Sequence, residues 1–302
     1  MSRPRILLTG ANGQLGWALR RTLTSLGDVV AQDSGALNLA DVATLRTRIR
    51  DIAPDLIVNA AAYTAVDKAE GDAERAHAVN AVAPGAMGEE AAKLGALLVH
   101  YSTDYVFNGA GERPWQEADR CDPLNVYGAT KLAGERAIEA TGCRHLIFRT
   151  SWVYGGRGTN FLLTMRRLMR ERAELKIVAD QIGAPTWCQD LAAATAQILS
   201  QIVSPMCQSA AAEPWGVYHL CNAGETSWHG FAAKIQALDA VHARPASARL
   251  IPIPGSDYPT PARRPLNSRL DCSKLERTFG LRMQAWDSAL ALCMDEMQSE
   301  TS

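Results

Sequence analysis

Short apolar runs alternate with longer amphipathic stretches along the first 180 residues. Most of the runs are apolar on both faces, which is typical of central parallel strands that helices cover on each side. The predicted strands are Arg5–Thr9, Asp28–Gln32, Asp55–Asn59, Leu97–Tyr101, His145–Arg149 and Lys176–Ala179. The predicted helices are Leu15–Ser25, Leu45–Asp51, Glu70–Leu94, Tyr127–Ala140 and Asn160–Arg172. This alternation predicts an α/β fold with βαβ crossovers and a doubly wound parallel sheet.

The composition of the chain changes after about residue 180, where Pro, Trp and polar residues become more frequent. The proline-rich segment from Ile251 to Pro265 is predicted to be irregular. We expect a core over residues 1–150, with further sheet elements to about 180 and interleaved later. Residues 151–302 are then mostly a smaller C-terminal lobe that binds substrate.

A glycine-rich loop follows the first predicted strand and opens the first predicted helix. Its glycines, Gly10, Gly13 and Gly16, are spaced G-x-x-G-x-x-G. They permit a tight turn, close approach of the backbone to a pyrophosphate, and packing of the helix on the strand. The helix N-terminus then offers free N–H groups to phosphates, so the core is predicted to be a dinucleotide-binding Rossmann domain.

Asp33 follows the second predicted strand, where a carboxylate can accept hydrogen bonds from an adenosine ribose. It is otherwise a solvated loop acid. As a ribose ligand it favours NAD, while arginines near the same pocket would permit NADP, so the cofactor remains either NADH or NADPH.

Tyr127 and Lys131 are four residues apart on one predicted helix and therefore share a face. A nearby ammonium is expected to lower the pKa of the tyrosine toward the working range. Thr103 comes at the carboxyl end of the fourth strand, where open α/β sheets place ligands. Its hydroxyl can bond a substrate carbonyl while Tyr127 donates a proton, although a turn cap is the ordinary role of such a threonine.

Composition excludes several classes of protein. The 31 Lys and Arg balance 32 Asp and Glu, so no basic face for nucleic acid is expected. No apolar run approaches the ~18 residues that span a bilayer, and no membrane partner is expected. The seven cysteines contain no Cys-x-x-Cys pair, which predicts reduced thiols in a cytoplasmic protein. The scattered histidines predict no metal site.

The chain resembles the extended short-chain dehydrogenase/reductase family over nearly its whole length. It is most similar to those members that reduce 4-keto sugars linked to dTDP. The stretches that carry the resemblance are Gly10–Gly16, Asn59–Glu70, Tyr101–Phe107, Pro123–Gly128, Thr130–Glu135, Arg149–Tyr154, and Arg264-Pro265 with Asn267-Ser268.

The resemblance implies a site and a reaction. Thr103, Tyr127 and Lys131 would be catalytic. The cofactor, NADPH or NADH, would be bound by Gly10, Gly13, Gln14, Leu15, Asp33, Asn38, Leu39, Ala62, Tyr63, Thr64, Tyr127 and Lys131. The dTDP-sugar would be bound by Thr103, Asp104, Trp152, Arg264 and Asn267. The reaction would reduce the C4 ketone of dTDP-4-dehydro-6-deoxy-L-mannose to dTDP-L-rhamnose.

Three positions depart from this family pattern, two at an expected metal site and one near the adenine. Some relatives are dimers bridged by magnesium through acidic side chains, but Ala18 and Gln189 replace two of those acids and leave only Glu296. Magnesium prefers carboxylates, so no metal is predicted, and a monomer or weak homodimer is expected. Asn38 stands where many relatives have an acidic residue, which alters a polar contact near the adenine.

Three alternatives remain at this point. A 4,6-dehydratase would need Glu after Asp104, where this chain has Tyr105. A 4-epimerase would retain its NAD, whereas a reductase releases oxidised cofactor. A non-catalytic, cofactor-binding regulatory subunit would not need the intact trio of Thr103, Tyr127 and Lys131.

Overall fold

A six-stranded, wholly parallel sheet forms the centre of the protein in a computed structural model that describes residues 3–203, 214–241 and 248–299. Its strands are β1 (Arg5–Thr9), β2 (Asp28–Gln32), β3 (Leu56–Asn59), β4 (Leu97–Thr103), β5 (His145–Thr150) and β10 (Gly216–His219). The strand order is β2-β1-β3-β4-β5-β10. The chain therefore reverses its direction of winding between β1 and β3, which confirms the doubly wound sheet and locates its ligand crevice.

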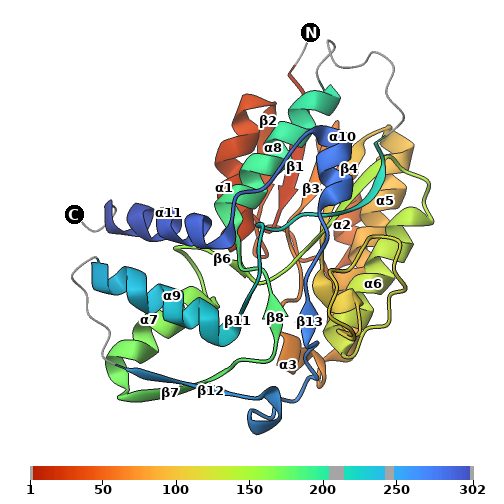
Figure 1. Cartoon of the computed structure of the whole chain (residues 1–302). Helices are drawn as coiled ribbons and strands as arrows, with labels where there is room; N and C mark the ends of the chain where they lie inside the picture. Colours follow the sequence, from red (N-terminus) through yellow and green to blue (C-terminus); the bar gives the residue numbers. More distant parts are fainter. Residues whose placement is uncertain (1–2, 204–213, 242–247, 300–302) are drawn as a thin grey trace.

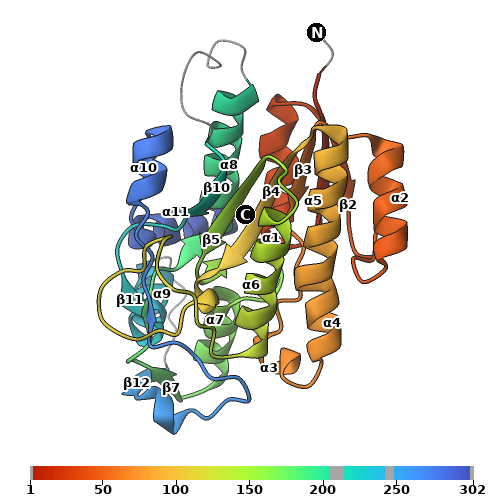
Figure 2. The ribbon, with the colours of Figure 1, turned by 90° about the vertical axis from the view of Figure 1, so that its right-hand side faces the viewer.

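Helices cover both faces of this sheet because its strands are apolar on both sides (Figure 2). Ile6 and Leu8 face one core, shared with α1 (Gln14–Thr22), α8 (Cys188–Val203) and α10 (Ser273–Phe279). Leu7 points to the opposite core, shared with α2 (Val42–Ile52), α5 (Ala83–Leu94) and α6 (Val126–Glu139). The alternation of Ile6, Leu7 and Leu8 thus sets the two helical layers.

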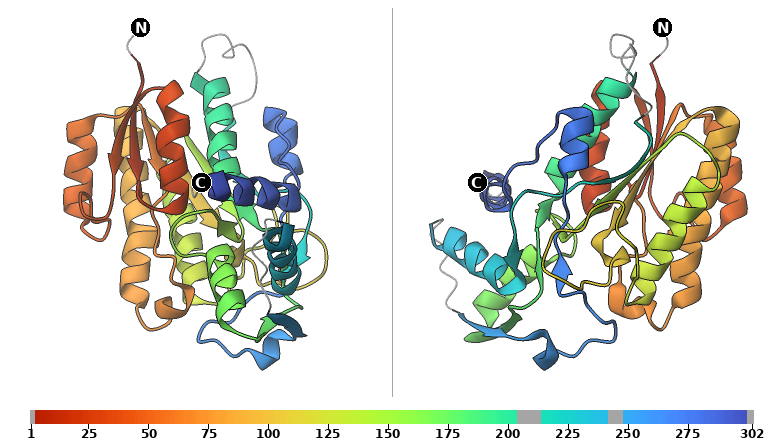
Figure 3. Two further views of the ribbon diagram at one scale, coloured as in Figure 1. Left: turned by 90° about the vertical axis from the view of Figure 1, so that its left-hand side faces the viewer. Right: turned by 45° about the vertical axis from the view of Figure 1, so that its right-hand side comes forward.

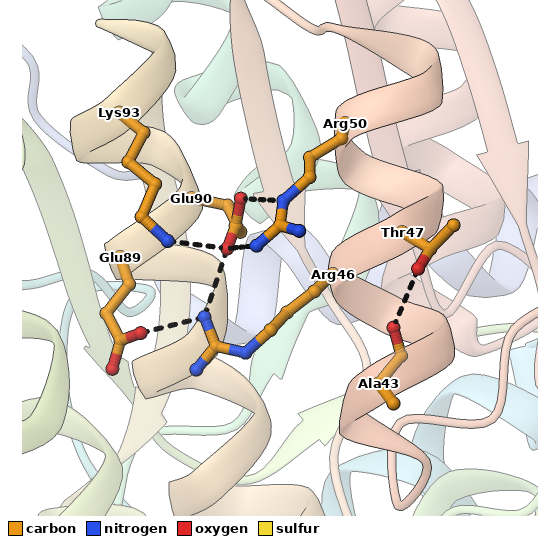
Figure 4. A network of polar contacts seen from close by, with 7 residues as sticks. All are labelled: Ala43, Arg46, Thr47, Arg50, Glu89, Glu90 and Lys93. Carbon is orange, nitrogen blue, oxygen red and sulfur yellow. Dashed lines mark hydrogen bonds and ion pairs between the residues drawn. The ribbon is translucent and has the colours of Figure 1, made fainter.

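An ion-pair cluster fastens α2 to α5 on the outer layer (Figure 4). The Glu90 carboxylate is 1% exposed and accepts from Arg46, Arg50 and Lys93 at 3.1, 2.6 and 2.9 Å. These contacts, with the hydrogen bond to Arg50 first, lower the pKa of Glu90 to about 2. The cluster holds a buried carboxylate ionised, so it contributes to stability only while Glu90 carries its charge.

The helix expected over Glu70–Leu94 is broken into several pieces. It consists of α4 (Ala73–His77), a π-helical turn at Ala78–Val82, and α5, and the short helix α3 (Val66–Ala69) precedes it. A π-turn adds a residue to the helical repeat and is often found at functional sites. Here it carries Asn80, whose contacts reach the site described below.

The remaining elements form a smaller layer, below the sheet in Figure 1. It contains α7 (Phe161–Glu171), α9 (Trp228–Val241), α11 (Trp286–Ser299), β7 (Glu174–Val178) and β12 (Arg249–Ile253). Tyr154, Phe231 and Leu290 are among the buried side chains that hold it together. Two short sheets lie between the layers: β11 (Thr226–Ser227) with β8 (Ile182–Gly183) and β13 (Asn267–Ser268), and β6 (Val153–Tyr154) with β9 (Thr186–Trp187).

Two expectations about this later part of the chain are wrong. The strand expected at Lys176–Ala179 forms as β7, but it pairs with β12 outside the main sheet (Figure 3). The sixth strand of the main sheet is β10. The proline-rich segment also contributes regular structure, because Pro252 lies in β12. Arg249 and Ile253 bond toward β7, so alternation turns Pro252 outward, where its missing N–H costs no ladder bond.

Two compositional expectations can be compared with the described residues. Their six cysteines are free, as expected, and Cys207 lies outside the described ranges. Among the helices of residues 3–203, 214–241 and 248–299, none is long and apolar enough to cross a membrane.

Candidate active site

The glycine loop lies at the switch point between β1 and β3. Gly10 has φ +70°, and a Cβ there would come within 2.7 Å of the Ala61 nitrogen, so the turn requires glycine. A Cβ on Gly16 would lie 2.0 Å from the Gly10 carbonyl oxygen, so glycine at this position lets α1 pack closely on the loop. Gly13 is exposed and its Cβ position meets only the Gly10 oxygen, at 3.3 Å. The backbone here is therefore open to a ligand.

The next predicted cofactor residues are held by local hydrogen bonds. Asp33 accepts from the Gly35 and Ala36 N–H groups at 3.0 and 2.9 Å, and from Asn12 at 2.6 Å. The bond from Ala36 contributes most to lowering the pKa of Asp33, which keeps the carboxylate ionised. The Asn38 side chain caps its own turn by accepting from the Ala40 N–H at 3.1 Å.

Two cofactor predictions fall on residues with a structural role. The Leu39 side chain is buried in the core shared by α2 and α5 and is therefore not available to a ligand. Leu15 packs against the core on the opposite side of the sheet. Gln14 instead accepts a hydrogen bond from Asn160 at 2.8 Å, which ties the glycine loop to the start of α7.

Asn80, which the sequence analysis missed, holds the predicted Ala62–Thr64 segment. Its amide accepts from the Tyr63 N–H at 2.8 Å and donates to the Tyr63 carbonyl at 3.1 Å. The same amide nitrogen reaches the Thr130 hydroxyl on α6 at 3.1 Å. Asn80 thereby connects the loop after β3 to the helix of Tyr127, and only the π-turn, which leaves no clear sequence signal, places it there.

Thr103 and Tyr127 meet at the carboxyl end of β4. Thr103 donates to Asp104 at 2.9 Å. Burial raises the pKa of Tyr127, and a hydrogen bond with Thr103 opposes part of that rise. Gly128 makes the approach possible, since a Cβ there would lie 2.2 Å from the Tyr105 carbonyl oxygen. The Tyr105 ring contacts the Tyr127 ring edge-on at 5.8 Å between centroids. The structure thus brings together the proposed proton donor and its hydroxyl partner.

Lys131 does not act on Tyr127 as expected. Its amine lies 2.6 Å from the Tyr101 carbonyl oxygen and 3.1 Å from Nε2 of His100. Burial raises the pKa of Tyr127 to about 12 and lowers the pKa of Lys131 to about 8. The expected lowering of the Tyr127 pKa is therefore wrong for this structure, because the lysine is turned toward β4. Tyr127 is held protonated, the form that a proton donor needs.

Asp104 places a poorly solvated carboxylate beside the trio. It is 3% exposed, and its Oδ2 has no hydrogen-bond partner among the described residues. Burial raises the pKa of Asp104 to about 6, although hydrogen bonds from Ser268 and Thr103 oppose the rise. A buried acceptor without a protein partner is suited to a ligand hydroxyl.

Trp152 forms an aromatic wall after β5. It stacks on Trp228 with 3.7 Å between ring centroids and 12° between planes. Its backbone has φ +48°, a left-handed conformation that is strained for a tryptophan. The indole is half-buried, so part of it remains accessible beside this stacking contact.

The other predicted substrate residues are engaged by protein partners. Arg264 pairs with Asp67 at 2.8 Å, and its Nη1 is buried with no partner among the described residues. Asn267 donates one N–H to the Arg113 carbonyl, and its side-chain oxygen accepts from Arg269. The Nη1 of Arg264 is therefore a buried donor that a ligand could use. The neighbouring Arg269 is paired with Glu225 at 2.6 Å.

No cluster of three or more His, Cys, Asp or Glu side chains within residues 3–203, 214–241 and 248–299 is arranged to hold a metal.

Comparison with known proteins places this site in a family. Residues 4–299 match the family model described as RmlD substrate binding domain. The chain belongs to this family. It is 48% identical over 301 residues to a dTDP-4-dehydrorhamnose reductase of Burkholderia thailandensis, covering 98% of this chain and 100% of the relative.

Solved structures of the same family have the same architecture. A dTDP-4-dehydrorhamnose reductase of Clostridium acetobutylicum superposes with a TM-score of 0.89 at 34% identity, covering 97% and 99% of the two chains. The enzyme of Bacillus anthracis, solved in complex with NADP, gives 0.86 at 33% identity, covering 98% and 100%. The family resemblance seen in the sequence is confirmed.

Proposed function

We propose that this protein reduces the C4 ketone of dTDP-4-dehydro-6-deoxy-L-mannose with NADPH or NADH, giving dTDP-L-rhamnose. The observation that carries the proposal is the pairing of Thr103 with a protonated Tyr127 at the carboxyl end of β4, beside the glycine loop. The relatives named dTDP-4-dehydrorhamnose reductase, one of them in complex with NADP, support both the substrate and the cofactor.

The residues present fit a nicotinamide dinucleotide. Side chains at Gly10 and Gly16 would collide with backbone atoms, whereas a Cβ at Gly13 would meet only the Gly10 carbonyl oxygen, at 3.3 Å. That combination produces a tight turn with an accessible backbone at a helix N-terminus, which suits a pyrophosphate. Gly13 and Gln14 would hold the phosphates, Asp33 the adenosine ribose, and Lys131 the nicotinamide ribose.

Tyr127 supplies the proton in the proposed reaction. Bound nicotinamide provides the hydride that C4 requires. The Thr103 hydroxyl positions the carbonyl oxygen, and Tyr127 protonates this oxygen as negative charge develops on it. Because burial raises the pKa of Tyr127 to about 12, the tyrosine keeps its proton until negative charge develops on the carbonyl oxygen.

Three residues are proposed to orient the sugar nucleotide. Asp104 presents its unpaired Oδ2 to a sugar hydroxyl, and Trp152 offers an apolar face to the deoxysugar. The buried Nη1 of Arg264 is directed to the diphosphate. A monomer or weak homodimer in the cytoplasm remains part of the proposal, which size-exclusion chromatography and cell fractionation test.

The experiment follows absorbance of NADPH, then of NADH, with the 4-keto sugar nucleotide supplied. We expect one cofactor oxidised per sugar, and loss of this oxidation in Tyr127→Phe. Tyr258→Phe, which removes a hydroxyl from an exposed side chain, is the matched control and retains activity. Binding of NADPH without oxidation would contradict the reductase and favour the regulatory-subunit alternative.

A further inference from the structure

A chain of buried polar groups extends from Lys131 into the sheet. The Lys131 amine lies 3.1 Å from Nε2 of His100, whose Nδ1 lies 2.9 Å from the Asn59 amide nitrogen. The Asn59 Oδ1 in turn accepts from the Thr9 hydroxyl at 2.7 Å and from the Ala61 N–H at 3.2 Å. His100 and Asn59 are each 1% exposed, so these hydrogen-bonded groups are shielded from bulk water.

The direction of these hydrogen bonds is fixed from one end. The backbone N–H of Ala61 can only donate, so the Asn59 atom that faces it must be the carbonyl oxygen. The amide nitrogen of Asn59 therefore faces His100 and donates to Nδ1. A neutral imidazole carries one N–H, so its proton resides on Nε2 and points at Lys131.

Lys131 then has to accept this hydrogen bond. An ammonium has three donors and no acceptor, whereas a neutral amine has a lone pair. The amine can still donate to the Tyr101 carbonyl oxygen, 2.6 Å away. We propose that His100 is a positioning residue that holds Lys131 in the resting protein as a neutral amine turned toward β4. This proposal deepens the proposed function and rests on it for the role of Lys131.

The charged groups around Lys131 are compatible with this state. Glu135, one turn further along α6, is the nearest carboxylate acting on it, but Arg149 from β5 neutralises Glu135 at 2.6 Å. Ser102 from β4 donates to the same carboxylate. Tyr127, one turn earlier on α6, is protonated. Burial lowers the pKa of Lys131 to about 8 and is also the main cause that lowers the pKa of His100. Both shifts are in the direction of the neutral forms.

The arrangement has a consequence for the reaction. When Tyr127 gives up its proton, the tyrosinate needs a nearby positive charge. Lys131 supplies that charge only after it gains a proton and turns away from His100 toward Tyr127. His100 therefore sets the pH at which Lys131 becomes an ammonium.

The tautomer of His100 tests the proposal in the free protein. We would record two-bond ¹H–¹⁵N correlations of histidine-labelled protein and assign His100 from the His100→Gln spectrum. The expected result is a protonated Nε2 and a bare Nδ1. A proton on Nδ1 would overturn the proposal.

Asn59→Asp is an isosteric change that should reverse the direction of the hydrogen bond between residue 59 and His100. Its carboxylate accepts from Nδ1–H of His100 while still accepting from Thr9 and Ala61, so the imidazole proton is expected to move to Nδ1. Lys131 then donates to Nε2 as an ammonium, and the alkaline limit of kcat should shift upward by about 1 pH unit. The signal that moves also assigns His100 if His100→Gln fails to fold. Gln197→Glu, an exposed amide-to-carboxylate change on α8, should alter neither readout.

An unchanged tautomer in Asn59→Asp, or an unchanged alkaline limit after the tautomer moves, would refute the role of His100. The spectra require neither cofactor nor substrate. Failure of NADPH oxidation in the wild-type protein would therefore count against the proposed function and leave the tautomer result separately readable.

Discussion

Asp104→Asn should raise the free energy of unfolding at pH 8 and weaken binding of the sugar nucleotide. The carboxylate is 3% exposed, and burial raises the pKa of Asp104 from 3.8 to about 6. The native state therefore binds a proton more tightly than the unfolded chain does. Stability is lost as pH rises from about 4 to 6, and at neutral pH the buried charge carries its full cost.

The size of the effect follows from the shift in pKa. About 2 units at 1.36 kcal/mol each amount to about 3 kcal/mol at pH 8. The amide NH₂ that replaces Oδ2 gains no protein partner, which offsets about 1 kcal/mol of this gain. The net stabilisation expected for Asp104→Asn is therefore about 2 kcal/mol at pH 8, and it should nearly vanish at pH 4.

Urea unfolding at pH 4 and pH 8 measures this difference, with Asp51→Asn on the exposed surface of α2 as the matched control. The same variant should raise KM for the sugar nucleotide, because an amide binds a hydroxyl less strongly than a carboxylate does. Equal or lower stability of Asp104→Asn at pH 8 would show that the buried carboxylate is already compensated, and would refute the reasoning.

Two further changes test the scaffold around the site. Glu90→Gln should destabilise the protein by about 1–3 kcal/mol at pH 7, and the lower part of this range reflects its half-exposed partners. The difference should shrink as pH falls from 4.5 to about 2, where Glu90 becomes protonated in the folded protein. Urea unfolding measures this, and Glu89→Gln, which breaks a single ion pair, should cost less. Gly128→Ala should reduce both activity and thermal stability, by about 1–3 kcal/mol, because its Cβ meets the Tyr105 carbonyl at 2.2 Å. Gly71→Ala, whose Cβ has no neighbour closer than 3.9 Å, should be tolerated, and equal behaviour of the two variants would contradict the packing argument.

The parts of the fold that local sequence determines could be predicted. β1 and its glycine loop are set by three apolar residues and by glycines at fixed spacing, and the requirement for glycine at Gly10 and Gly16 is visible in the backbone. The order of strands and helices through β5 follows similarly from alternating patterns. Lys176–Ala179 was misassigned because its partner, β12, is some 70 residues further along the chain, and a strand pattern does not name its partner.

Predictions at the site failed where a side chain's partner comes from a distant element. The spacing of Tyr127 and Lys131 puts them on one face of α6, but His100 on β4 decides where the amine points. The role of Asn267 as a substrate ligand stays a prediction, although its side chain contacts Arg113 and Arg269. Asn80 depends on a π-turn that helix propensities do not reveal.

The most direct test of the central claim is the fate of the transferred hydrogen. NADPH deuterated at the reactive C4 position of its nicotinamide would be given to the wild-type protein with dTDP-4-dehydro-6-deoxy-L-mannose, and the sugar product examined by mass spectrometry and NMR. We predict one deuterium at C4 of the sugar for each cofactor oxidised, and none with Tyr127→Phe. Sugar that is epimerised or dehydrated without net oxidation of NADPH, or deuterium at any other carbon, would contradict the account.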